Sequence, residues 1–137
     1  MLLLDTGVVI AALDRREPQH PACRELIETS IESVGILAPT ICEIDHLIGR
    51  RLGPSAMPLL LRDIETGAYK LADLTLLDFP RVRELLERYA DLDVGFVDAA
   101  VLAIVERLNE PKLATLDRMH FGAMRPRHVD VLELLPA

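Results

Sequence analysis

The chain has 137 residues, half of them hydrophobic, and a formal net charge of −7 at pH 7. This length fits one domain over residues 1–137, and the lack of a long apolar stretch or a signal-peptide pattern favours a cytoplasmic protein without a membrane span. The acidic balance argues against a broad basic face for nucleic acid, although carboxylates gathered around a divalent cation would also make the charge negative.

Short apolar runs alternate with helix-periodic segments along the chain. The elements expected in chain order are a strand at residues 2–4, helices at 6–15 and 20–33, a strand at 35–39, helices at 40–53 and 54–67, a strand at 70–75, helices at 77–92 and 96–109, a strand at 111–117 and a weakly marked strand at 128–134. Strands that alternate with helices predict parallel pairing in a three-layer α/β domain.

Four acidic residues lie where these strands lead into helices. Asp5 directly follows the first strand, and Glu43 lies in the first turn after the second. Asp98 stands near the start of the apolar helix at residues 96–109. Asp117 is the last residue of the strand at residues 111–117. Because ligands bind outside the carboxyl ends of parallel strands, we expect these four carboxylates at one edge of the sheet.

Each acid also has a local explanation. Asp5 could cap the helix that follows it, and Thr40 with Glu43 matches a capping box. Asp98 could stabilise a helix N-terminus through the macrodipole, and Asp117 could begin a turn. Taken singly, these residues leave the choice between local roles and a shared site open.

Taken together, the four carboxylates favour a metal site. Several carboxylates in one pocket repel one another, so they must bind protons or a cation. Oxygen ligands without clustered His or Cys suit Mg²⁺ or Mn²⁺ rather than zinc. Since a metal held in this way can activate water and stabilise an in-line displacement at phosphorus, the residues point to phosphate chemistry.

Four segments resemble, in order and spacing, the PIN domain, and most closely its prokaryotic branch of VapC-type toxins from toxin–antitoxin pairs. They are LLLDTG, PTICEIDHL, LDVGFVDAAVLAIVERL and LATLDRMHF. The resemblance covers almost the whole chain and implies a Rossmann-like, three-layer α/β/α fold with a central parallel sheet. It also implies a Mg²⁺- or Mn²⁺-dependent endoribonuclease that acts on structured RNA such as tRNA or rRNA.

The resemblance assigns roles by position. The residues that match the family's catalytic and metal-binding acids are Asp5, Glu43, Asp98 and Asp117. Thr6 and Thr115 fall where the family often carries a hydroxyl beside an acid, so we expect them to support the site.

Two positions depart from the family pattern. Asp93 stands where relatives commonly have an uncharged residue, and we assign the family acid to Asp98 because it begins the long apolar helix. His120 stands where an acid is frequent, so a fifth acidic contact is absent or replaced. Among the basic residues, Arg118 is the favoured contact for RNA phosphates because it directly follows Asp117.

The resemblance also implies partners, namely a VapB-like antitoxin whose C-terminal segment lies in a groove near the site, and a second toxin copy in a homodimer. A mean hydropathy of +0.25 is high for a small soluble chain and fits apolar surface buried against a partner.

Two other interpretations stay open. A receiver-like acidic-pocket domain would carry paired acids after its first strand, whereas Asp5 stands alone there. A catalytically silent PIN-like binding module would need no complete acid set, yet all four acids are present.

Overall fold

A computed structural model describes all residues from Met1 to Ala137. Five strands form one parallel sheet with the order β3-β2-β1-β4-β5. They are β1 (Leu2–Leu4), β2 (Val34–Leu37), β3 (Lys70–Ala72), β4 (Lys112–Ala114) and β5 (Glu133–Leu135). The helices are α1 (Thr6–Leu13), α2 (His20–Glu28), α3 (Ile41–Leu52), α4 (Ala56–Glu65), α5 (Phe79–Arg88), α6 (Phe96–Arg107) and α7 (Arg118–Ala123). None of these helices is long and apolar enough to cross a membrane.

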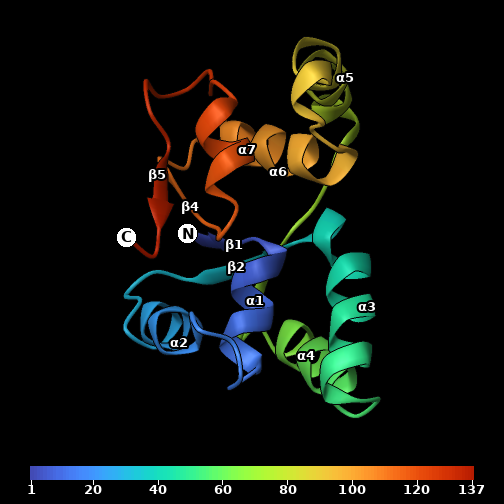
Figure 1. Ribbon diagram of the computed structural model, residues 1–137, viewed down its shortest axis with the longest axis vertical. Helices are drawn as coiled ribbons and strands as arrows, with labels where there is room; N and C mark the ends of the chain where they lie inside the picture. The colour runs from blue at the N-terminus through green and yellow to red at the C-terminus, as the bar shows by residue number, and fades with distance from the viewer.

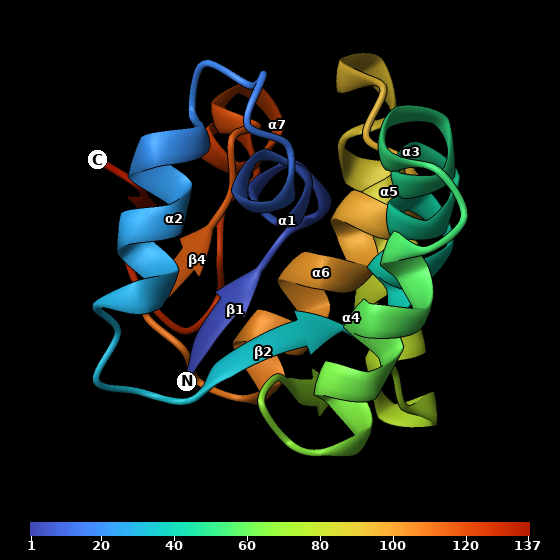
Figure 2. The same ribbon diagram turned by 90° about the horizontal axis from the view of Figure 1, so that it is seen from below.

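The helices cover both faces of the sheet (Figure 1). Helices α1–α4 lie on one face and α5–α7 on the other, and Figure 2 looks from the α1–α4 side onto β4, β1 and β2 lying next to one another. Strand β1 alternates accordingly, since Leu3 packs in the cluster with α6 whereas Leu2 and Leu4 pack in the cluster with α1. The predicted three-layer α/β/α fold with a central parallel sheet is therefore confirmed.

The strand order also separates two of the interpretations. Receiver domains place their strands in the order 2-1-3-4-5, so that the first strand lies second in the sheet. Here β1 lies in the centre, between β2 and β4. The receiver-like interpretation is therefore wrong.

The structure differs from the predicted elements at several points. Helix α2 ends at Glu28 and leaves Ile31 fully exposed, because Thr29 Oγ1 donates to the Glu25 carbonyl and Ser30 forms its own turn with Glu32. The last strand is residues 133–135 rather than 128–134, because pairing with β4 sets its register. Helix α7 was not expected.

Helix α3 ends at a residue whose backbone conformation is unfavourable for any residue with a side chain. Gly53 has φ +81° and ψ −175°, a conformation that essentially only glycine adopts. We expect Gly53→Ala to lower the free energy of unfolding by about 1–3 kcal/mol, measured by urea denaturation. Gly49→Ala, within the same helix and with open space around its Cα, should instead stabilise by about 0.5–1 kcal/mol. Equal effects of the two substitutions would contradict this account of the helix end.

Candidate metal centre

The sheet order brings the four predicted acids toward one edge. The chain builds β2 and β3 on one side of β1 and then returns to build β4 and β5 on the other. Such a reversal opens a crevice at the carboxyl ends of the two strands that flank it, here β1 and β4. Asp5 follows β1 and Asp117 lies three residues after the end of β4, so both border this crevice. Helix α6 leads back into β4, so its first turn, which contains Asp98, lies at the same edge.

Asp5 is the most buried of the four acids, with 7% of its surface exposed. Its Oδ2 accepts a hydrogen bond of 2.8 Å from Thr115 Oγ1, and its side chain forms no cap on α1. Burial raises the pKa of Asp5 to about 6, against the hydrogen bond from Thr115, and the charges on Asp98 and Glu43 act in the same direction as burial. Asp5 is therefore a carboxylate whose negative charge the fold leaves uncompensated.

Glu43 accepts a hydrogen bond from the first residue of α1. Thr6 Oγ1 donates to Glu43 Oε1 at 2.8 Å, across 37 residues of chain. Thr40 Oγ1 donates instead to the carbonyl of Leu37, and α3 has no side-chain cap, so the capping-box interpretation of this pair is wrong. The two predicted supporting threonines thus each bind one acid, Thr6 binding Glu43 and Thr115 binding Asp5.

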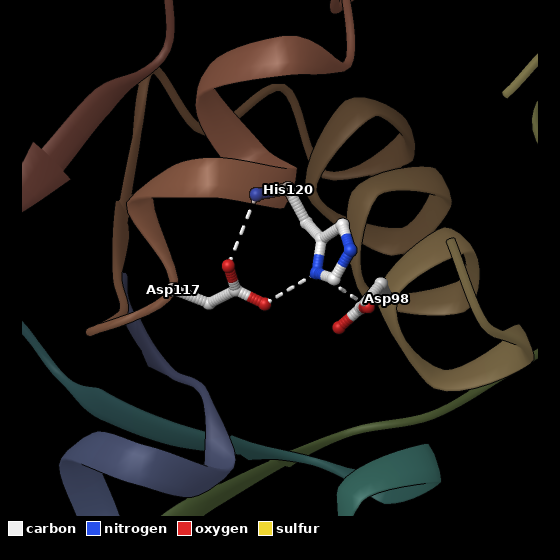
Figure 3. Close-up of side chains that lie close together, drawn as sticks. All are labelled: Asp98, Asp117 and His120. Carbon is white, nitrogen blue, oxygen red and sulfur yellow. Dashed lines mark hydrogen bonds and ion pairs between the residues drawn. The ribbon is translucent and has the colours of Figure 1, made fainter. Parts of the chain in front are cut away.

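Asp98, Asp117 and His120 form a compact group (Figure 3). One potential ligand atom from each residue lies within 4.8 Å of the others. Burial raises the pKa of Asp98, and the charges of Asp117 and Glu43 raise it further while His120 opposes them. The pKa of His120 is raised, chiefly by its hydrogen bond with Asp117. Because seven consecutive residues after Asp98 are buried in the core, α6 holds this carboxylate in a fixed position.

Asp117 has a local and a shared role at once. Its Oδ1 accepts the backbone N–H of His120 at 3.0 Å and so caps α7, while its Oδ2 faces the His120 ring. Its own backbone N–H donates to Thr115 Oγ1 at 3.0 Å. Thr115 therefore connects Asp117 to Asp5 and fixes the relative positions of the two strand ends.

We expect these two hydrogen bonds of Thr115 to stabilise the folded protein. We expect Thr115→Val to lower the free energy of unfolding by about 1–3 kcal/mol at pH 7, because it removes the donor to buried Asp5 and the acceptor of the Asp117 N–H. Thr115→Ser keeps the hydroxyl and should cost about 0.8 kcal/mol for the lost methyl group. Chemical denaturation measures both, and equal losses would show that the hydroxyl does not stabilise the site.

Other candidates lie outside this group. Asp93 is exposed and has a left-handed backbone with φ 56°, so the structure places Asp98 rather than Asp93 among the acids. The Arg118 guanidinium donates to the carbonyls of Leu134 and Pro136, which attaches it to the C-terminal strand. The sequence leaves the contact at His120 open, because the signal that His120 meets Asp117, a spacing of three residues in a helix, depends on α7, which the residue pattern does not predict.

The side chains present fit a divalent cation. Asp98 and Asp117 lie together, and the raised pKa values of Asp5 and Asp98, to which the charge of Glu43 contributes, express the cost of keeping these two carboxylates charged without a cation. Carboxylate oxygens are donors for Mg²⁺ and Mn²⁺. The group therefore has the composition of a metal centre at the carboxyl edge of the sheet.

Comparisons of the sequence and of the fold with known proteins agree with one another. The sequence profile of the PIN domain matches residues 2–125. Ribonuclease VapC26 of Mycobacterium tuberculosis is 31% identical over 125 residues, which cover 91% of this chain and 93% of that protein. The fold resembles M. tuberculosis VapC20, described as a sarcin–ricin loop cleaving toxin, with a TM-score of 0.81 at 18% identity over 95% of this chain and 99% of that one. It also resembles VapBC2 of Rickettsia felis, solved with promoter DNA, with a TM-score of 0.69 at 15% identity over 97% of each chain.

Proposed function

The chain belongs to the PIN domain family, in its VapC-type branch, and from this we propose that it is a Mg²⁺- or Mn²⁺-dependent endoribonuclease toxin formed by residues 1–137. The relative that is 31% identical is a ribonuclease, which supports RNA as the substrate. The observation that carries the proposal is that the carboxyl edge of the sheet gathers the four predicted acids, with Asp98 and Asp117 in one compact group and with the pKa of Asp5 and Asp98 raised by burial and by neighbouring carboxylates that include Glu43.

The proposed roles follow from the contacts of each side chain. Asp98 and Asp117 are partly exposed and would hold the cation together with buried Asp5 and exposed Glu43. A bound Mg²⁺ or Mn²⁺ supplies a lower pKa for an attacking water and charge stabilisation at the phosphoryl oxygens. Since Thr115 binds Oδ2 of Asp5, the hydroxyl fixes the rotation of that carboxylate.

Thr6 has the same positioning role at the second acid. It is the first residue of α1 and binds Oε1 of Glu43. Glu43 is otherwise exposed in the first turn of α3, where its long side chain would be mobile. The hydroxyl of Thr6 therefore restrains Glu43 toward Asp5.

RNA contacts form a further part of the proposal. Arg118 is exposed and adjacent to Asp117, which keeps it as a candidate for a flanking phosphate. A phosphate would have to displace the carbonyls of Leu134 and Pro136 from its guanidinium. Arg16 and Arg51 already pair with Asp14 and Glu17, respectively, and so have less charge to offer RNA.

We further propose a VapB-like antitoxin partner and a homodimer. The R. felis relative in fold was solved as a VapBC complex, which supports an antitoxin. Large apolar side chains stand exposed around the starts of α5 and α6, which supports surface covered by another chain. They are Leu76, Leu77, Phe79 and Phe96.

RNA cleavage in the presence and absence of EDTA tests the function. We expect the protein with Mg²⁺ or Mn²⁺ to cut tRNA or ribosomal RNA fragments, and EDTA or Asp98→Asn to abolish the cut. Asp93→Asn, an exposed acid five residues earlier, is the matched control and should retain activity. Cleavage that resists EDTA would refute the metal-dependent mechanism, and RNA binding without cleavage under any metal would favour the silent binding module.

A further inference from the structure

The imidazole ring of His120 is oriented by a contact outside the acidic group. Its Nε2 lies 3.1 Å from the backbone carbonyl oxygen of Leu92. A carbonyl can only accept a hydrogen bond, so Nε2 is a donor. Nδ1 faces the acids, where its hydrogen bond to Asp117 Oδ2 would give way, with loss of the proton, when a cation binds. Histidines that bind metals in proteins almost always donate from their other ring nitrogen to a carbonyl, carboxylate or water in this way.

The distances around Nδ1 fit neighbouring positions in one coordination shell. Nδ1 lies 2.8 Å from Asp117 Oδ2 and 3.5 Å from Asp98 Oδ2 (Figure 3). Adjacent ligands of an octahedral ion with bonds of about 2.1 Å lie about 3 Å apart. The three donor atoms come from two separate elements, since α6 carries Asp98 whereas Asp117 and His120 belong to the start of α7.

The group is open enough for an ion to enter. The side chains of His120, Asp98 and Asp117 are 19%, 24% and 34% exposed, respectively. Three donors on one side leave the remaining positions of an octahedral ion for Asp5, Glu43, water or substrate. The set thus differs from an all-carboxylate centre in having a nitrogen donor beside Asp98 and Asp117.

We infer that Nδ1 of His120 is a direct ligand of the divalent cation and that the centre consequently prefers Mn²⁺ to Mg²⁺. Imidazole nitrogen suits first-row transition ions, whereas Mg²⁺ takes oxygen ligands. The inference rests on the proposed function only for the presence of a cation, because the ligand assignment comes from the geometry of His120. On this assignment, the nitrogen of His120 takes the place of the acid that is frequent at this position of the family.

Pulsed electron paramagnetic resonance of the Mn²⁺-loaded protein tests the ligand without any substrate. Wild type should show ¹⁴N modulation from a directly bound imidazole, and this measurement needs no variant. His120→Asp should keep Mn²⁺ bound through its carboxylate and lose the modulation. His46→Asn is the matched control, since His46 is exposed on α3 three residues after Glu43, and it should keep the modulation.

Calorimetric titration of the same proteins with Mn²⁺ or Mg²⁺ alone tests the preference. We expect wild type to bind Mn²⁺ at least about tenfold more tightly than Mg²⁺, and His120→Asp to lower that ratio by about tenfold. The His46→Asn protein should keep the wild-type ratio.

The outcomes separate the ligand from the function. Mn²⁺ binding without ¹⁴N modulation, or with the same ratio in wild type and His120→Asp, would overturn the role of His120 and leave metal-dependent cleavage standing. If the wild type shows ¹⁴N modulation but cuts no RNA, His120 remains a metal ligand and the proposed function is refuted. Failure of Mn²⁺ to bind would overturn both.

Discussion

Asp5→Asn should remove RNA cleavage and at the same time stabilise the metal-free protein. The ionised carboxylate is buried, and Asp98 and Glu43 repel it, so its pKa rises from 3.8 to about 6. A shift of about two units corresponds to about 3 kcal/mol between the two protonation states. Asparagine has no charge and can still accept from Thr115, so we expect a gain of about 1–3 kcal/mol at pH 7 in EDTA. Thermal and urea unfolding measure the gain.

The raised pKa of Asp5 also predicts how the stability difference between the two proteins changes with pH. Because the pKa of Asp5 is higher in the folded protein than in the unfolded chain, the folded state binds more protons between pH 4 and about 6. The metal-free wild type therefore loses stability through Asp5 as the pH rises through this window. Asp5→Asn lacks this loss, so the two proteins should differ least near pH 4 and most above pH 6.

A cation should reverse the order of the two proteins. On the proposed function, Mn²⁺ binds the folded wild type and should stabilise it, whereas Asp5→Asn should gain less because it lacks one of the proposed ligands. Asp93→Asn, an exposed acid, should follow wild type in every condition. An Asp5→Asn protein that is less stable than wild type at pH 7 in EDTA would show that the buried charge carries no cost.

The positions of the acids could be predicted because they follow from short-range patterns. Apolar runs mark the strands, alternation with helices marks parallel pairing, and the residues after parallel strands meet at one edge. This reasoning indicates Asp5, Glu43, Asp98 and Asp117 before any family is considered. It also favours Asp98 over Asp93, because Asp98 begins the long apolar helix, and the buried run after it agrees with that choice.

The contacts of these acids could not be predicted, because they cross long stretches of sequence. Thr40 and Glu43 have the spacing of a capping box, but Thr6 binds Glu43 from α1 and Thr40 binds the Leu37 carbonyl. Likewise, Leu92 fixes the His120 ring from 28 residues away. Local spacing identified residue types, and tertiary packing decided their partners.

A second long-range network joins α5, α6 and the segment before β5. Arg81 is buried, although it lies on a helix whose two other arginines are exposed. Its guanidinium donates twice to Glu106, at 2.8 and 2.9 Å, and also to Glu84 and to the Arg125 carbonyl. Glu106 in turn accepts the backbone N–H of Arg127. Arg81 therefore holds the chain that leads into the last strand.

Arg81→Met should be the most destabilising substitution outside the apolar core. Methionine keeps the packing of the side-chain stem, but it leaves Glu106, whose side chain is only 9% exposed, without its cation. Loss of one partner from a buried ion pair costs about 3–5 kcal/mol, so we expect a loss of this size in urea unfolding at pH 7. Adding Glu106→Leu should restore most of it, because the unpaired buried charge is then gone.

Arg83→Ala is the matched control for this prediction. Arg83 lies two residues along the same helix and pairs with Glu87, but the two side chains are 72% and 66% exposed. Such a pair contributes little in water, so the substitution should change stability by less than about 0.5 kcal/mol. If Arg81→Met cost no more than Arg83→Ala, or if Glu106→Leu deepened its loss, the burial of a charge would not be the cause.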